Sequence, residues 1–96
     1  MTWNEHIVVA YDVQDDRARE AFASRLMDLG LQRVQLSVFE ASLPKNRVRD
    51  VWDLSEEFCR EAGRSVRVFL VCSTCYRRAR SFGETGKVDD AEYRIV

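Results

Sequence analysis

The residue of this sequence best placed for chemistry is Asp12. It directly follows residues 7–11, Ile-Val-Val-Ala-Tyr, an apolar run rich in β-branched side chains, which is typical of a buried strand. A carboxylate at the tip of such a strand is held by rigid backbone at the edge of a core, which suits a metal ligand or a general base. Because Asp is also a common turn residue, the pattern leaves open whether Asp12 does chemistry or only begins a turn.

Arginines follow Asp12 closely. Asp15 and Asp16 precede a helical pattern, and acids in this position cap free amides, so we expect a helix that begins near Asp16. Arg17 and Arg19 fall in its first turn and should point outward, where their planar guanidinium groups could bind a phosphate near the strand tip. The alternative is that they form ordinary surface ion pairs with neighbouring acids.

A single carboxylate is enough for a magnesium site if two copies of the chain meet. Mg²⁺ needs only one or two protein carboxylates and keeps its other positions for water and phosphate oxygens. A two-fold dimer that brings Asp12 of both chains together would therefore assemble a site for metal-assisted phosphodiester cleavage.

Three other arrangements receive less support. Cys72 and Cys75 have the spacing of a zinc or redox pair, but zinc needs four ligands, and Cys59 falls on an expected core stripe. Little else around the pair indicates thioredoxin-like chemistry, so we assign it no role. His6, the only histidine, lies far from Ser37 in the pattern, which argues against a hydrolytic triad.

The composition is that of one ordinary globular domain. The chain has 96 residues, 46% hydrophobic and 32% charged, with one Pro and four Gly, and we treat residues 1–96 as one domain. It has no long apolar segment and no secretion signal, so we expect a cytoplasmic protein that does not enter membranes, with reduced thiols. The net charge is −1, but all 15 basic residues except Lys45 and Lys87 are Arg, so nucleic acid would have to bind local Arg clusters.

The spacing of apolar residues predicts two core helices. In the first, Ala18, Phe22, Leu26 and Leu29 form a stripe, and Gly30 ends the helix. Pro44 opens the second, which should end before Gly63. Its expected stripe consists of Val48, Val51, Trp52, Ser55, Phe58, Cys59 and Ala62.

Alternating residues predict strands around these helices. Residues 31–43 alternate without a Gly or Asn-Gly turn, so they form either one bent strand or two short strands broken by a bulge near residues 35–37. Residues 65–72 form a strand that is apolar on both faces, which favours a second layer supplied by another copy of the chain. A basic short helix or loop follows, and residues 92–96 resemble a small terminal strand. This order predicts an α+β ferredoxin-like sandwich, with two helices on one face of an antiparallel sheet.

Two motifs resemble the signature of the small CRISPR-associated adaptation endonucleases, the compact partners of the CRISPR integrase that are often called endoribonucleases. The first is Tyr11-Asp12-Val-Gln-Asp-Asp16 with Arg19 after it, and the second is Gly30-x-x-Arg33-Val-Gln35-x-Ser37-Val-Phe39-Glu40. The match is close over residues 1–43 and loose beyond them. Ala21 stands where some members carry a further basic residue, and the cysteine pair is not part of the signature.

The resemblance implies an antiviral role in spacer acquisition. It implies a ferredoxin-like homodimer in which the C-terminal strand, within a tail of residues 83–96, crosses to the partner subunit. It also implies Mg²⁺ or Mn²⁺ between the two copies of Asp12, contact with the integrase, and cleavage of RNA or duplex DNA. The positions that the family associates with activity or site architecture are Tyr11, Asp12, Arg19, Arg33, Ser37 and Phe39. The alternative function is a non-catalytic dimeric scaffold that binds duplex DNA and bridges integrase subunits.

Overall fold

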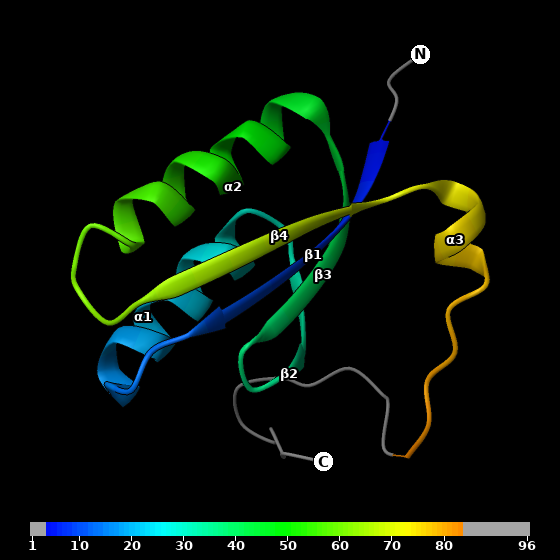
Figure 1. Cartoon of the computed structure of the whole chain (residues 1–96). Coiled ribbons are helices and arrows are strands. Elements are labelled where there is room, and N and C mark those ends of the chain that lie inside the picture. The colour runs from blue at the N-terminus through cyan, green and yellow to red at the C-terminus, as the bar shows by residue number, and fades with distance from the viewer. Residues whose placement is uncertain (1–3, 84–96) are drawn as a thin grey trace.

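The fold is a four-stranded antiparallel sheet with two long helices on one face. A computed structural model describes residues 4–83. Its elements are β1 (Asn4–Asp12), α1 (Asp16–Asp28), β2 (Gln32–Gln35), β3 (Val38–Pro44), α2 (Lys45–Phe58), β4 (Ser65–Val71) and α3 (Ser73–Arg77). The sheet order is β2-β3-β1-β4, and α1 and α2 lie side by side on the same face (Figure 1). The predicted ferredoxin-like sandwich is confirmed, whereas the expected C-terminal strand lies outside the described residues.

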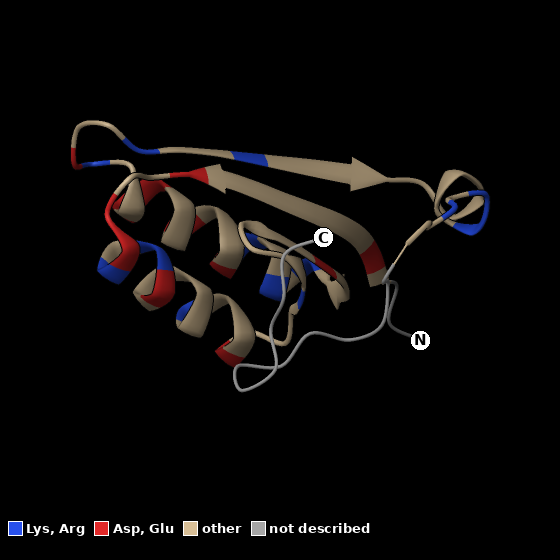
Figure 2. Ribbon diagram, turned by 90° about the horizontal axis from the view of Figure 1, so that it is seen from below, with Lys and Arg blue, Asp and Glu red and all other residues tan. Residues whose placement is uncertain are grey.

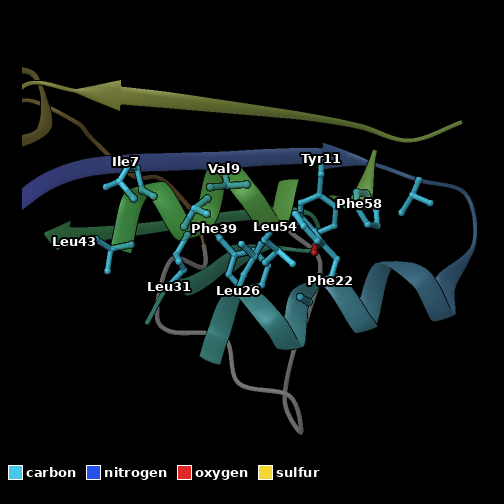
Figure 3. Packing of buried hydrophobic residues seen from close by; sticks show 14 residues of the cluster. Ile7, Val9, Tyr11, Phe22, Leu26, Leu31, Phe39, Leu43, Leu54 and Phe58 are labelled. Atoms are coloured by element: carbon cyan, nitrogen blue, oxygen red, sulfur yellow. The ribbon is translucent and has the colours of Figure 1, made fainter. Parts of the chain in front are cut away.

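Strand β1 is central and divides its side chains between two faces. Ile7, Val9 and Tyr11 are buried toward the helices, as expected for a period of two, and Figure 3 shows them pointing into the core. His6, Val8, Ala10 and Asp12 alternate with them and belong to the opposite face, which we call the open face because neither α1 nor α2 covers it. The core contains Ile7, Val9, Tyr11, Val13, Phe22, Ala23, Leu26, Leu31, Phe39, Leu43, Val48, Val51, Leu54 and Phe58.

Helix α1 begins and ends where the sequence predicts. The Asp15 carboxylate accepts hydrogen bonds from the backbone N–H groups of Arg17 and Ala18, at 3.3 Å each, and so caps the helix. Gly30 follows the last turn with φ 100°, a conformation that side chains disfavour.

Substitutions of Asp15 test how much the helix cap contributes to stability. Asp15→Ala should lower the free energy of unfolding by about 1 kcal/mol, because two helix-end amides lose their acceptor. Asp15→Asn removes the same charge but keeps a capping oxygen, so it should cost only a few tenths of that amount. Urea denaturation followed by circular dichroism measures both. Equal losses in the two variants would show that charge, not the cap, matters at this position.

Residues 31–43 form a hairpin. The expectation of one bent strand is wrong, and the alternative of two short strands is confirmed, but the chain reverses completely at Leu36 and Ser37. A register shift between Arg33 and Gln35 marks a bulge one residue earlier than expected. The Arg33 guanidinium donates to the Leu36 carbonyl from Nε at 3.2 Å and from Nη2 at 3.1 Å. A side chain therefore holds this turn, and the turn needs no glycine because neither Leu36 nor Ser37 has a positive φ.

Helix α2 is shorter than predicted. It ends at Phe58, with Cys59 as its C-cap, and Gly63 lies in the turn beyond it. The buried face consists of Val48, Val51, Leu54, Ser55 and Phe58. Trp52, Cys59 and Ala62 were predicted to be buried but are exposed, because Trp52 lies about 100° around the helix from Val51 and the other two follow the helix end.

Helix α3 packs on the open face. It follows β4 directly, and the Tyr76 ring stacks on the His6 ring with centroids 4.2 Å apart and planes within 5°. The negative charge of Glu40, then burial and a hydrogen bond to Glu40, raise the pKa of the Tyr76 hydroxyl. Within residues 4–83, no helix has the length and apolar character needed to cross a membrane.

Candidate active site at the end of strand β1

Asp12 lies where three segments of chain meet. It is the last residue of β1 and pairs in register with Ser65, the first residue of β4. On the other side, the hairpin turn passes close by, because the Tyr11 N–H donates to the Ser37 carbonyl at 3.0 Å. The Asp12 side chain is exposed and makes no hydrogen bond or ion pair with any residue between positions 4 and 83. This carboxylate is therefore available to a ligand.

The other acids of the β1–α1 loop already have partners. The Asp15 carboxylate caps α1, and that of Asp16 forms an ion pair with Arg19. Figure 2 shows this region as a cluster of acidic and basic residues where β1 runs into α1. In one copy of the chain, Asp12 is thus the carboxylate of this loop that a cation could bind without breaking a described contact.

Arg19 is folded back onto this loop. Besides its pair with Asp16, it donates from Nη2 to the Val13 carbonyl at 2.9 Å, and only 16% of its side chain is exposed. The expectation that Arg19 points outward is wrong, because the loop offers its guanidinium two acceptors. Arg17 is exposed as expected and has no ion pair with a described residue. Of the two arginines in the first turn, Arg17 is the one free to meet a phosphate.

Arg33 is buried on the helix-covered side of the sheet. Its side chain is 1% exposed and forms a two-pronged ion pair with Glu20 of α1, at 3.1 and 3.0 Å. Its guanidinium carbon lies 5.3 Å from the centre of the Phe39 ring, and the Leu36 carbonyl accepts two further bonds from it. Arg33 therefore joins α1 to the hairpin that passes Asp12.

Tyr11 and Phe39 are core residues. Tyr11 packs edge-on against Phe22, with ring centroids 4.7 Å apart, and Phe39 and Phe58 each lie at 6.2 Å from it (Figure 3). Tyr11 points to the face opposite Asp12, and Phe39 is fully buried. Both rings are therefore part of the packed core beneath the strand tip.

The structure thus divides the predicted site residues into two groups. Asp12 and the hairpin turn at Ser37 are adjacent at the surface, whereas Tyr11, Arg33 and Phe39 lie beneath them and Arg19 braces the loop. Sequence reasoning did not assign Ser65 to the strand tip or Glu20 to Arg33, because both contacts join segments far apart in the chain.

One chain by itself supplies few metal ligands. Between residues 4 and 83, no three His, Cys, Asp or Glu side chains are grouped closely enough to hold a metal ion. The exposed, unpaired oxygens of Asp12 are nonetheless of the kind that Mg²⁺ or Mn²⁺ prefers, and one protein carboxylate can suffice for Mg²⁺ when water and phosphate oxygens supply the rest. The donor set fits a hard divalent cation shared with a second copy or with a substrate.

Comparisons with known proteins give a consistent result. The family described as CRISPR associated protein Cas2 matches residues 5–79. The CRISPR-associated endoribonuclease Cas2 1 of Archaeoglobus fulgidus is 36% identical over 89 residues, covering 84% of this chain and 85% of the relative.

Solved structures share the fold. Streptococcus pyogenes Cas2 superimposes with a TM-score of 0.68 at 29% identity, covering 81% of this chain and 99% of that one. A chain of a partial Cas6-RT-Cas1–Cas2 complex has a TM-score of 0.60 at 24% identity over 93% of each chain, which shows a common fold. The resemblance carried by the two motifs is confirmed. Since the family match spans most of the sequence and the Archaeoglobus relative aligns along most of both chains, this chain belongs to the CRISPR-associated Cas2 family.

Proposed function

We propose that this protein is a metal-dependent endonuclease that acts in CRISPR adaptation. The observation that carries the proposal is Asp12, an exposed carboxylate without a described partner on the tip of a central strand. Membership of the Cas2 family supports it, as does the name endoribonuclease of the Archaeoglobus relative. The proposed reaction is hydrolysis of phosphodiester bonds in RNA or duplex DNA.

The active form that we propose is a homodimer. Phe69 of β4 pairs in register with Val8 on the open face, and half of its surface is exposed, so this face has apolar area to bury. Asp12 belongs to the same face, so a two-fold contact there could bring the two carboxylates together. The crossing of a C-terminal strand to the partner belongs to this proposal too, although residues 84–96 lie outside the described part of the chain.

Each group near Asp12 then has a distinct task. A divalent cation, when bound, would polarise the phosphate and lower the pKa of a bound water. The two Asp12 carboxylates would hold it, and Arg17, exposed in the first turn of α1, would bind the phosphate backbone. Arg19, Arg33, Tyr11 and Phe39 would position this site through the loop, the hairpin and the core.

The test is a cleavage assay on the full-length protein. Labelled RNA and duplex DNA are incubated with MgCl₂, with MnCl₂, and with EDTA, while light scattering gives the mass of the same preparation. We expect a dimer that cleaves at least one substrate with metal and neither with EDTA. Cleavage that persists in EDTA contradicts the metal proposal, and cleavage by a monomer contradicts the shared site.

One observation favours a second candidate, a DNA-binding scaffold for the integrase. Arg77, Arg78 and Arg80 are exposed at the end of α3, and none forms an ion pair with a residue that the structure describes. Such a cluster can bind phosphates without cleaving them. Two results together would favour this function. Both substrates would remain intact in the cleavage assay, and the affinity for duplex DNA, measured separately, would fall steeply as salt is added.

A further inference from the structure

The exposed cysteines at the junction of β4 and α3 form a distinct pair. Cys72 follows the last residue of β4 and is the N-cap of α3, and Cys75 lies in the first turn of that helix. The Cys75 N–H donates to the Cys72 Sγ at 3.4 Å, so the Cys72 sulfur already lies against the backbone of Cys75. Both are free thiols, and Cys59, the third cysteine, lies at the far end of α2.

The two thiols interact in a way that makes them unequal. Hydrogen bonds from the Cys75 backbone and thiol, with a smaller contribution from the Arg77 charge, lower the pKa of Cys72. The same interaction raises the pKa of Cys75. A thiolate, not a thiol, attacks a disulfide, so Cys72 is the better attacking group and Cys75 the one held in reserve.

A partner can reach Cys72. An open pocket of about 330 Å³ adjoins it, lined by Asn4, Glu5, His6, Leu70, Val71, Cys72 and Ser73, and Cys75 is not among these residues. Both thiols are exposed, so this pocket gives an incoming disulfide room beside Cys72, and the Cys75 thiol would remain next to the bond that forms.

We propose that Cys72 and Cys75 are a reversible dithiol–disulfide pair that exchanges with low-molecular-weight disulfides. The Cys72 thiolate attacks one sulfur of such a disulfide, which forms a mixed disulfide and releases one thiolate. Cys75 then loses its proton to solvent, and its sulfur attacks the Cys72 Sγ, which closes the intramolecular bond and expels the second thiolate. Two protein thiols are oxidised and one small disulfide is reduced to two thiols. A large excess of small thiol reverses both steps.

The experiment uses the reduced full-length protein and oxidised glutathione, with intact mass and peptide mapping as readouts. The wild type should become two hydrogens lighter, with Cys72 linked to Cys75 and Cys59 still open to alkylation. Cys75→Ser should instead retain one glutathione on Cys72, because no thiol can displace it. In Cys72→Ser, adduct formation at Cys75 should be at least about threefold slower than at Cys72 in Cys75→Ser. Circular dichroism checks that both variants fold.

Three outcomes would overturn the proposal. The first is glutathione that stays on wild-type Cys72 as stably as on the Cys75→Ser variant, since the second exchange would then not occur. The second is reaction at Cys72 no faster than at Cys59, which is also exposed but is not one of the pair. The third is a disulfide that links two copies of the chain, seen by non-reducing electrophoresis, instead of Cys72 and Cys75. None of these results depends on nuclease activity, so this proposal is tested independently of the proposed Asp12 site.

Discussion

Asp12→Asn is expected to remove metal-dependent cleavage while leaving the protein folded. Mutation of a residue that only hydrogen-bonds to a metal ligand already lowers metal affinity or activity by about 10- to 100-fold. Loss of a direct ligand should therefore lower the cleavage rate by at least about 100-fold. In the proposed dimer, the substitution removes both Asp12 carboxylates from the shared metal site. Stability should change by less than about 0.5 kcal/mol, because the side chain is exposed and has no described partner to lose. Cleavage rates at saturating Mg²⁺, with urea denaturation in parallel, measure both effects.

Asp15→Asn is the matched control for this experiment. It removes the same charge three residues away, at another exposed position, and asparagine still caps α1. Its cleavage rate should stay within about twofold of the wild type if the site depends on the Asp12 carboxylate and not on the negative charge of the loop. Equal losses of cleavage rate in the two variants would mean that Asp12 acts only through its negative charge and not as a metal ligand. Full activity of Asp12→Asn would leave the scaffold as the function to pursue.

The sequence predicts the fold here because the local signals agree with one another. The apolar run before Asp12, the acids before α1 and Gly30 after it each define an element edge, and the order of elements then allows few topologies. Two errors occur at the ends of elements, where the apolar pattern does not show that the chain turns. The hairpin turn at Leu36 and Ser37 carries no glycine because neither residue has a positive φ, so the usual turn signal is missing from the sequence. The stripe of α2 was extended past Phe58 because its periodicity continues into the turn.

The candidate site was predictable in part for the same reason. Asp12 could be found from sequence, since a strand tip is a local feature. The sequence does not show whether an arginine is free to bind a phosphate, because this depends on which acid or carbonyl the fold brings close to its side chain. Arg17 and Arg19 are two residues apart and look alike in sequence, yet one is exposed and the other binds the Val13 carbonyl and Asp16. The resemblance implies that Arg33 serves activity or site architecture, and the structure shows it buried in contacts with Glu20 and the Leu36 carbonyl beneath the strand tip.

Arg33→Met is expected to cause the largest loss of stability. Methionine retains much of the buried stem but removes every donor, so the Leu36 carbonyl loses both of its Arg33 bonds and Glu20 loses its partner. Hydrogen bonds of charged groups contribute about 1.5–3 kcal/mol, and the Glu20 side is discounted because that side chain is 53% exposed. We expect a loss of about 3 kcal/mol in the free energy of unfolding, or roughly 12–24 °C in Tm.

Glu20→Gln and temperature separate the parts of this effect. Glutamine keeps an acceptor for Arg33 and leaves the hairpin bonds intact, so it should cost about 1 kcal/mol or less. If Arg33 only positions the site, the Arg33→Met protein should cleave like the wild type at low temperatures, where circular dichroism shows that it is folded. Its dependence on Mg²⁺ concentration should then also be unchanged. A folded Arg33→Met dimer that remains inactive would instead mean that the guanidinium itself is needed for the reaction. Because the Arg33 side chain is 1% exposed beneath the strand tip, we expect the folded variant to cleave like the wild type.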